Sequence, residues 1–259
     1  MSRLADRIAA AKAENRAALI AYLPVGYPDV DASIAAMVAA VEGGADIVEI
    51  GVPYSDPGMD GPVIQQAVDV AVRAGVGMRD VLRAVEAVAG AGAVPVPMSY
   101  WNPIERYGVE RFAGDLAAAG GAGAITPDLI PDEAGEWIAA SDEHGLDRIF
   151  LVSPSSTEAR VRSTTAACRG FVYATALMGV TGARDQVSSD APALVERVRA
   201  VTRTPVAVGL GVRDGAQAAA IGAFADGVIV GSALVAALAE GGIAAVAALT
   251  ADLAAGVRA

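Results

Sequence analysis

The chain has 259 residues, of which 54% are hydrophobic and only 5% aromatic, and its formal charge is -11 at pH 7. This length and aliphatic composition favour one large domain of layered strands and helices, and they exclude a disordered chain. The acidic balance disfavours nucleic acid or an anionic membrane as a partner, since both bind clustered Lys and Arg side chains.

After a leading helix over residues 2–14, short apolar runs predict eight strands, over residues 18–23, 45–50, 94–98, 122–126, 147–152, 171–175, 205–208 and 226–230. Amphipathic patterns predict the helices between and after them, over residues 31–42, 63–73, 79–88, 109–119, 131–143, from about 153–156 to 167, 191–201, 214–222, from 233 onward and 243–257. The alternation predicts an α/β fold. We expect a single (β/α)8 TIM-barrel domain over residues 1–259, with an extra N-terminal helix and an inserted helix after the second strand.

Lysine, histidine and cysteine each occur once, as Lys12, His144 and Cys168. Neither Lys12 nor His144 falls at the end of a predicted strand, which disfavours a Schiff-base lysine, a Ser-His-Asp triad and a His-rich metal site. An enzyme with this inventory is expected to move protons with carboxylates and to hold no metal. One cysteine excludes an intrachain disulfide. We find no signal peptide and no apolar run long enough to span a bilayer, so we expect a cytoplasmic protein.

The stretch over residues 46–66 is the strongest candidate for catalysis. Glu49 lies at the end of an apolar strand, where burial raises the free energy of an ionised carboxylate, so it is a candidate proton carrier. The following Pro- and Gly-rich loop contributes Asp56 and Asp60. Each acid also has an ordinary interpretation: Glu49 as an ion-pair partner, Asp60 as a helix cap and Asp56 as a turn residue.

In a parallel barrel, the loops that follow the strands share one face. Polar and glycine residues therefore converge there from several strands: Glu49, Asp60, Tyr100, Asn102, Asp128, Thr181, Gly211 and Ser232. Three successive turns, at Gly182, at Gly209 with Gly211 and at Gly231 with Ser232, place backbone N–H groups near helix starts, which favours a bound phosphate over turns that are merely tight. Taken singly, Tyr22, Tyr100 and Trp101 are better explained as ordinary barrel-rim aromatics than as residues that stack on a ligand.

Together these residues resemble the tryptophan synthase alpha chain family over nearly the whole chain. The resemblance rests on the motifs at residues 21–28 (AYLPVGYP), 49–65 (EIGVPYSDPGMDGPVIQ), 99–103 (SYWNP), 127–129 (PDL), 179–184 (GVTGAR), 209–212 (GLGV) and 231–232 (GS). It implies a lyase of tryptophan biosynthesis that splits indole-3-glycerol phosphate into indole and glyceraldehyde 3-phosphate. It implies a beta chain as partner, in an alpha2-beta2 tetramer, with pyridoxal phosphate in the beta chain and no cofactor in this chain.

The resemblance also assigns roles to individual residues. Glu49 and Asp60 match the catalytic acids, and Tyr22, Tyr100 and Thr181 match the substrate pocket. The phosphate-binding positions are Gly182, Gly211, Gly231 and Ser232, and the partner-facing positions are Pro53, Asp56, Asn102 and Pro103.

Three residues depart from the common family pattern: Met59, Ala176 and Leu210. We expect them to affect rate and coupling to the partner more than reaction type. Two further interpretations stay open: a stand-alone lyase that needs no beta chain, and a catalytically weak subunit whose main role is to activate its partner.

Overall fold

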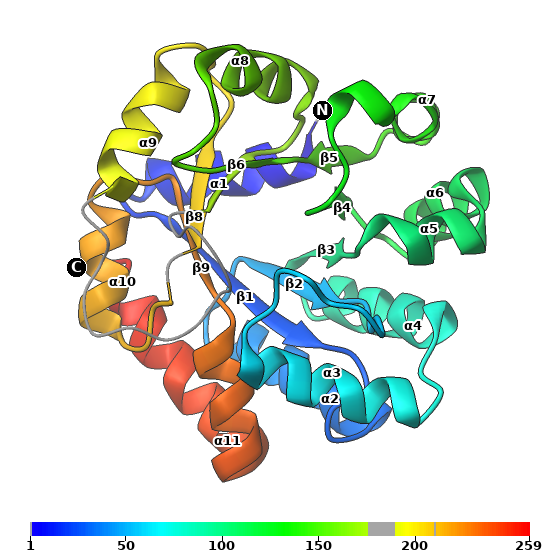
Figure 1. Cartoon of the computed structure of the whole chain (residues 1–259). Helices are drawn as coiled ribbons and strands as arrows, with labels where there is room; N and C mark the ends of the chain where they lie inside the picture. Colours follow the sequence, from blue (N-terminus) through cyan, green and yellow to red (C-terminus); the bar gives the residue numbers. More distant parts are fainter. Residues whose placement is uncertain (1, 176–189, 210) are drawn as a thin grey trace.

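The computed structural model describes residues 2–175, 190–209 and 211–259. Parallel strands form the centre and helices surround them (Figure 1). The strands are β1 (Ala18–Pro24), β2 (Ile47–Gly51), β3 (Val94–Met98), β4 (Gly123–Ile125), β5 (Asp147–Ile149), β6 (Leu151–Val152), β7 (Val172–Thr175), β8 (Val206–Gly209) and β9 (Gly227–Val230). Each predicted strand is present, with bounds that differ by one or two residues.

The sheet closes on itself. Its order is β5-β4-β3-β2-β1-β9-β8-β7-β6, so it begins and ends with β5 and β6, which are two halves of one stretch interrupted at Phe150. Around the interruption, this stretch is hydrogen-bonded to β7 and to the residues before β7: Phe150 O accepts from Tyr173 N at 3.2 Å, and Arg148 O accepts from Arg169 N at 2.9 Å. The predicted (β/α)8 barrel is therefore confirmed.

The helices are α1 (Arg3–Ala13), α2 (Val30–Glu42), α3 (Pro62–Arg73), α4 (Met78–Gly90), α5 (Trp101–Tyr107), α6 (Val109–Ala118), the 3-10 turn η1 (Pro131–Glu133), α7 (Gly135–Glu143), α8 (Glu158–Ala167), α9 (Asp190–Arg199), α10 (Gly215–Gly222) and α11 (Ser232–Gly256). The inserted helix after the second strand is confirmed, because α3 and α4 both lie between β2 and β3. The short helix α5 was not predicted. The expected helix start at residues 153–156 is wrong, because Thr157 is the N-cap of α8 and its side chain accepts from Arg160 N.

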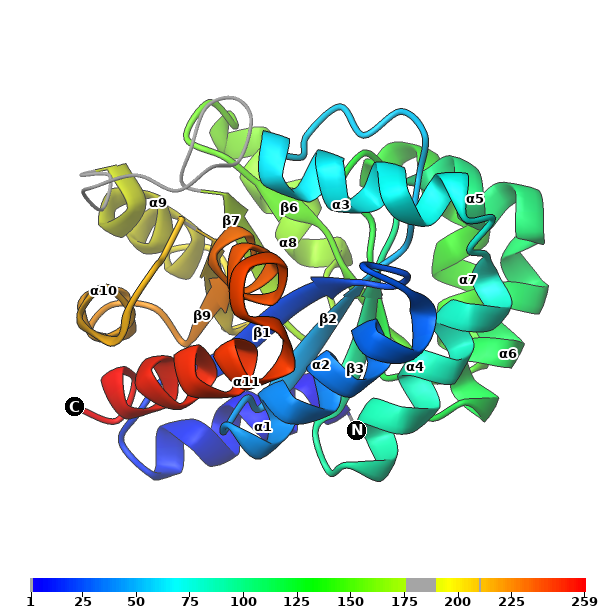
Figure 2. The ribbon, with the colours of Figure 1, turned by 90° about the horizontal axis from the view of Figure 1, so that it is seen from below.

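Alternation along the strands divides the apolar residues into two clusters. Val48 and Ile50 of β2 pack outward against the helices, whereas Ile47 belongs to a second cluster inside the barrel. Leu4 and Ile8 of α1 join this inner cluster, so α1 closes the end of the barrel where the strands begin. Figure 2 shows α1 and the loop between β2 and α3 at opposite edges of the molecule. The end of the barrel where the strands finish is not closed by α1, and this is where we expect a functional site.

In the part of the chain that the structure describes, α11 is the one helix long and apolar enough to cross a membrane by length and composition, which the sequence analysis overlooked. Gly242 has a non-helical backbone (φ 66°, ψ -158°), so α11 consists of two shorter helical segments that meet at a kink. The helix packs against α2, α10 and β1. Leu234, Val246 and Leu253 are buried in these contacts.

Candidate active site

Glu49 lies on the inner face of the barrel. Successive side chains of a strand point to opposite faces, so Glu49 points to the same face of β2 as Ile47, which belongs to the inner cluster. It pairs in register with Tyr22 of β1 and Val96 of β3. The side chain is 1% exposed, and neither carboxyl oxygen has a hydrogen-bond partner among the described residues. Burial raises the pKa of Glu49 to about 8, so the carboxyl group is largely protonated at neutral pH. The alternative interpretation of Glu49, an ion pair with an arginine, finds no support in the described part of the chain, where no such pair is present.

Asp60 lies in the loop between β2 and α3, at the end of the barrel where the strands finish. Its carboxylate is partly buried, and burial raises its pKa to about 6. The N-cap of α3 is Gly61, and no side chain makes a cap hydrogen bond there. Asp60 is therefore not the N-cap residue of α3.

Two buried tyrosines, Tyr22 and Tyr173, are each influenced by the charges of both acids. Burial raises the pKa of both Tyr22 and Tyr173 well above the ordinary value, and the negative charges of Asp60 and Glu49 raise it further in each case. Charges act on a pKa in this way only over short range. Glu49 and Asp60 therefore both lie near Tyr22 and Tyr173, although they come from a strand and from the loop that follows it.

Each tyrosine ring lies over a glycine of the neighbouring strand. A Cβ atom on Gly51 would approach the Tyr22 hydroxyl oxygen to 2.4 Å, and one on Gly209 would approach that of Tyr173 to 2.6 Å. Both distances are too short for any side chain, so glycine is required at these positions to accommodate the phenol rings. Sequence reasoning missed Tyr173, although its alternation with the inward-facing Phe171 was a usable signal.

The inner face near the strand ends also supplies apolar side chains. Met98 of β3, Ile125 of β4 and Leu151 of β6 belong to or pack against the inner cluster, and Met98 pairs in register with Ile125. An apolar wall with a few polar groups is the usual composition of a small-molecule pocket. These three residues were also missed, because a strand sequence does not mark which apolar positions line a cavity.

The loop after β3 carries Tyr100, which is 9% exposed. Its hydroxyl oxygen accepts a hydrogen bond from Met59 N at 2.9 Å, and its ring lies 5.2 Å from that of Tyr54. Tyr100 therefore contacts the Asp60 loop directly. The first residue of α5, Trp101, donates its backbone N–H to Asp128 Oδ1 at 2.9 Å. Met59 is 36% exposed, so its side chain is not packed in the core.

Two helix starts follow the last two strands, and they differ in whether carboxylates of the described residues bind there. At α10, the side chain of Asp214 accepts from Gln217 N and that of Asp252 accepts from Gly215 N, so two carboxylates already occupy this terminus. At α11, Gly231 is the N-cap and makes no side-chain cap hydrogen bond, and Ser232 is the first helical residue. The positive end of the helix dipole at α11 therefore favours a phosphate.

Gly211, in the loop after β8, has φ 65°, a conformation that favours glycine. It precedes α10, whose start is already occupied by carboxylates, so Gly211 would offer a phosphate its own loop amide rather than a helix dipole. Thr181 and Gly182, which were also predicted to contact substrate, lie outside the described residues, as do Ala176 and Leu210.

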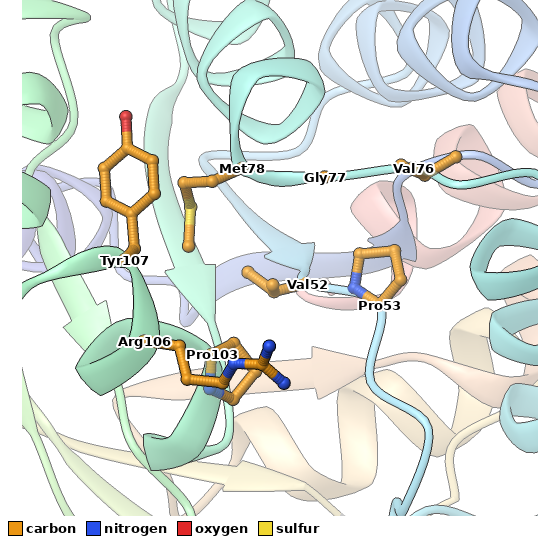
Figure 3. A pocket seen from close by; sticks show the side chains of 8 residues that line it. All are labelled: Val52, Pro53, Val76, Gly77, Met78, Pro103, Arg106 and Tyr107. Carbon is orange, nitrogen blue, oxygen red and sulfur yellow. The ribbon is translucent and has the colours of Figure 1, made fainter.

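The predicted partner-facing residues lie around the same mouth. Pro53 and Asp56 are in the loop after β2, and Asn102 and Pro103 are in α5. Asp56 is exposed and accepts a hydrogen bond from the Ser55 hydroxyl at 2.6 Å. Pro53 and Pro103 meet across a cavity of about 270 Å³ (Figure 3). The complete lining is Val52, Pro53, Val76, Gly77, Met78, Pro103, Arg106 and Tyr107.

The three single residues lie away from this mouth. Lys12 pairs with Asp226 at 3.4 Å beside the beginnings of the strands, and His144 contacts Glu110 at 2.6 Å. Cys168 is buried, and burial raises the pKa of its thiol to about 12. Within residues 2–175, 190–209 and 211–259, no group of three or more His, Cys, Asp and Glu side chains is placed to hold a metal ion.

A buried carboxyl group with a raised pKa and a second carboxylate, near the same buried tyrosines at the mouth of a β/α barrel, define the class of an acid–base enzyme. The profile of the tryptophan synthase alpha chain family matches residues 8–255. The chain belongs to this family, whose members are lyases that catalyse the alpha reaction of tryptophan synthase.

The relatives support this assignment over the full length. The tryptophan synthase alpha chains of Mycobacterium avium and Mycobacterium marinum are each 65% identical over 257 residues, which cover 99% of this chain and 95% of theirs. A structure of Mycobacterium tuberculosis tryptophan synthase aligns with a TM-score of 0.96 at 64% identity, covering 100% of this chain and 99% of that one. The alpha subunit from Legionella pneumophila aligns with a TM-score of 0.91 at 31% identity, covering 99% and 98%.

Proposed function

We propose that this chain cleaves indole-3-glycerol phosphate into indole and glyceraldehyde 3-phosphate, with Glu49 and Asp60 as the catalytic residues. One observation carries the proposal: the carboxyl group of Glu49 is buried on the inner face of the barrel and has no hydrogen-bond partner among the described residues. Its pKa of about 8 supplies a protonated acid at neutral pH, which catalysis of this cleavage requires.

The bond changes balance with these two acids. Glu49 donates its proton to C3 of the indole ring, which makes the ring an electron sink, and Asp60 in its ionised form stabilises the cationic ring nitrogen. Glu49 then removes the proton of the glycerol hydroxyl next to the ring. The carbon–carbon bond breaks as the aldehyde forms, and its electron pair restores the aromatic indole. Glu49 ends the cycle protonated.

The remaining residues bind and orient the substrate. Tyr22, Tyr100 and Tyr173, with Met98, Ile125 and Leu151, enclose the indole ring, and Thr181 contributes from outside the described residues. The N–H groups at Gly231 and Ser232 bind the phosphate at the start of α11, supplemented by Gly211 and, from outside the described residues, by Gly182.

The partner is a beta chain, with which tryptophan synthase alpha chains function. We place it on Pro53, Asp56, Asn102 and Pro103, in an alpha2-beta2 tetramer whose pyridoxal phosphate is held by the beta chain. This chain itself carries no cofactor in the proposal, and it acts in the cytoplasm. The exposed Asp56 and the two prolines beside the mouth support a contact that senses the loop carrying Asp60.

Steady-state indole release by the purified chain, alone and with its beta chain, tests the proposal against its alternatives. Slow release that accelerates on mixing is the expected result. Fast release by the chain alone identifies a stand-alone lyase. No release under either condition, with beta-chain activity still stimulated, identifies a subunit that only activates its partner.

Replacing Glu49 with Gln tests the assigned acid. The change preserves shape and removes the titratable proton, so we expect turnover to fall by about a thousandfold or more while substrate binding persists. Single-turnover indole release and equilibrium binding separate the two effects. A Glu49→Gln chain that retains most of its turnover contradicts the assignment.

A further inference from the structure

Asp60 does not sit on a rigid element. It belongs to the loop over residues 52–61, which has no helix or strand between the end of β2 and the start of α3. A Cβ atom on Gly58, two residues earlier, would meet nothing within 4 Å, so no side chain packs against the loop at that point. A catalytic carboxylate must nevertheless be held to within a fraction of an ångström. Other contacts must fix the Asp60 backbone.

One contact comes from the end of β3. The hydroxyl oxygen of Tyr100 accepts a hydrogen bond from the backbone N–H of Met59, the residue directly before Asp60, at 2.9 Å. The Tyr100 side chain is buried, which keeps this acceptor in one place.

The other contact comes from α3. Gln65 Nε2 donates to Asp60 O at 2.9 Å and reaches Pro57 O at 3.5 Å. Only the amide nitrogen of a glutamine can serve two carbonyl oxygens, so the orientation of this side chain is determined. Gln65 is also fixed by its helix, because its own backbone N–H donates to Gly61 O at 2.9 Å.

We propose that Gln65 is a positioning residue for Asp60, and that Gln65 and Tyr100 together form a clamp on the backbone of residues 59 and 60: Tyr100 holds the N–H of Met59 and Gln65 holds the C=O of Asp60. The clamp rests on the proposed catalytic role of Asp60. With both backbone groups held, the direction of the Asp60 side chain relative to Glu49 is set by β3 and α3 rather than by the loop.

The test compares Gln65→Met with Gln66→Met, each in complex with the beta chain. Both changes replace an exposed glutamine of α3 with an unbranched side chain of similar length and helix propensity, but only Gln65 contacts the loop. For Gln65→Met we expect kcat for indole release to fall about tenfold and KM to change less than twofold. The control should match the unmodified chain.

The pH profile distinguishes positioning from a general loss of structure. Once released, the Asp60 side chain becomes more hydrated, so its pKa falls from about 6 towards the ordinary value and the acid limb of the activity profile moves to lower pH. Equal kcat and equal acid limbs in Gln65→Met and Gln66→Met would overturn the clamp.

The second half of the clamp is tested with Tyr100→Phe and the double variant. Because both residues hold the same short segment of backbone, we expect the combined fall in kcat to be smaller than the product of the two single falls. If the fall in kcat of the double variant equals the product of the two single falls, the two residues do not act as one clamp. Asp60→Asn separates the two proposals: if it keeps its turnover, the role of Asp60 fails, whereas if it is inactive and Gln65→Met is normal, only the clamp fails.

Discussion

At the scale of single residues, the site depends on the different environments of two carboxyl groups. Glu49 is enclosed by the barrel and has a pKa of about 8, whereas Asp60 is partly exposed and has a pKa of about 6. At pH 7 the first is therefore mainly protonated and the second mainly ionised. Burial alone divides the roles of acid and electrostatic stabiliser between them.

This division predicts a bell-shaped pH dependence. Activity should be gained as the pH rises through about 6, because Asp60 must ionise, and lost as it rises through about 8, because Glu49 must stay protonated. The measurement is kcat/KM for indole release between pH 5 and 9. Activity that keeps rising through pH 9 contradicts a protonated Glu49 in the free enzyme.

The same burial makes Glu49 costly for stability. Its folded pKa lies above the unfolded value of 4.5, so its contribution is most favourable below pH 4.5 and is lost progressively as the pH rises towards 8. At pH 7 the penalty is about 3 kcal/mol. The neutral Glu49→Gln chain should therefore gain stability relative to the unmodified chain between pH 5 and pH 8, measured by urea unfolding. A difference that does not change with pH contradicts a buried carboxyl group here.

At the scale of elements, the sequence was sufficient for the strands and for most helices, because each apolar run or amphipathic period is a local signal. The short helix α5 was missed since Pro103 and the aromatic residues around it are typical of a loop. The start of α8 was placed too early, within residues 153–156. Ser156 and Thr157 are both good caps, and only the structure shows that Thr157 makes the cap bond.

The site residues also divide into those with a local sequence signal and those that only the structure shows. Glu49 and Asp60 could be selected from the sequence, because acids at a strand end and in a Pro- and Gly-rich loop are unusual. Tyr173 was missed although its alternation with Phe171 marks it as facing inward. Gln65 could not be selected, since its role depends on a contact with the Asp60 carbonyl group that only the fold of the loop creates.

Helix α11 gives a prediction at this scale. A Cβ atom on Gly256 would lie 2.0 Å from Gly215 O, so Gly256→Ala must separate α10 from the end of α11. We expect a loss of about 1–3 kcal/mol in the free energy of unfolding. The matched control is Gly90→Ala at the last residue of α4, where a Cβ would meet nothing within 4 Å and the change should be neutral or stabilising. Equal effects in urea unfolding contradict the close helix contact.

At the scale of the whole molecule, the two ends of the barrel have different tasks. Helix α1 closes the end where the strands begin, and Asp147, at the start of β5, accepts hydrogen bonds from the Ser2 hydroxyl at 2.7 Å and from Leu4 N at 3.4 Å. The opposite end carries both acids, the tyrosines and the open start of α11. We propose that the chain is one domain, because its first strand, β1, pairs with its last strand, β9.

The most direct test of the central claim is a crystal structure of the Glu49→Gln chain with its beta chain and bound indole-3-glycerol phosphate. We expect the residue 49 side chain about 3–3.5 Å from C3 of the indole ring, the Asp60 carboxylate at the ring nitrogen and the phosphate at the start of α11. An indole ring bound outside the barrel mouth, or with C3 turned away from residue 49, would contradict the account.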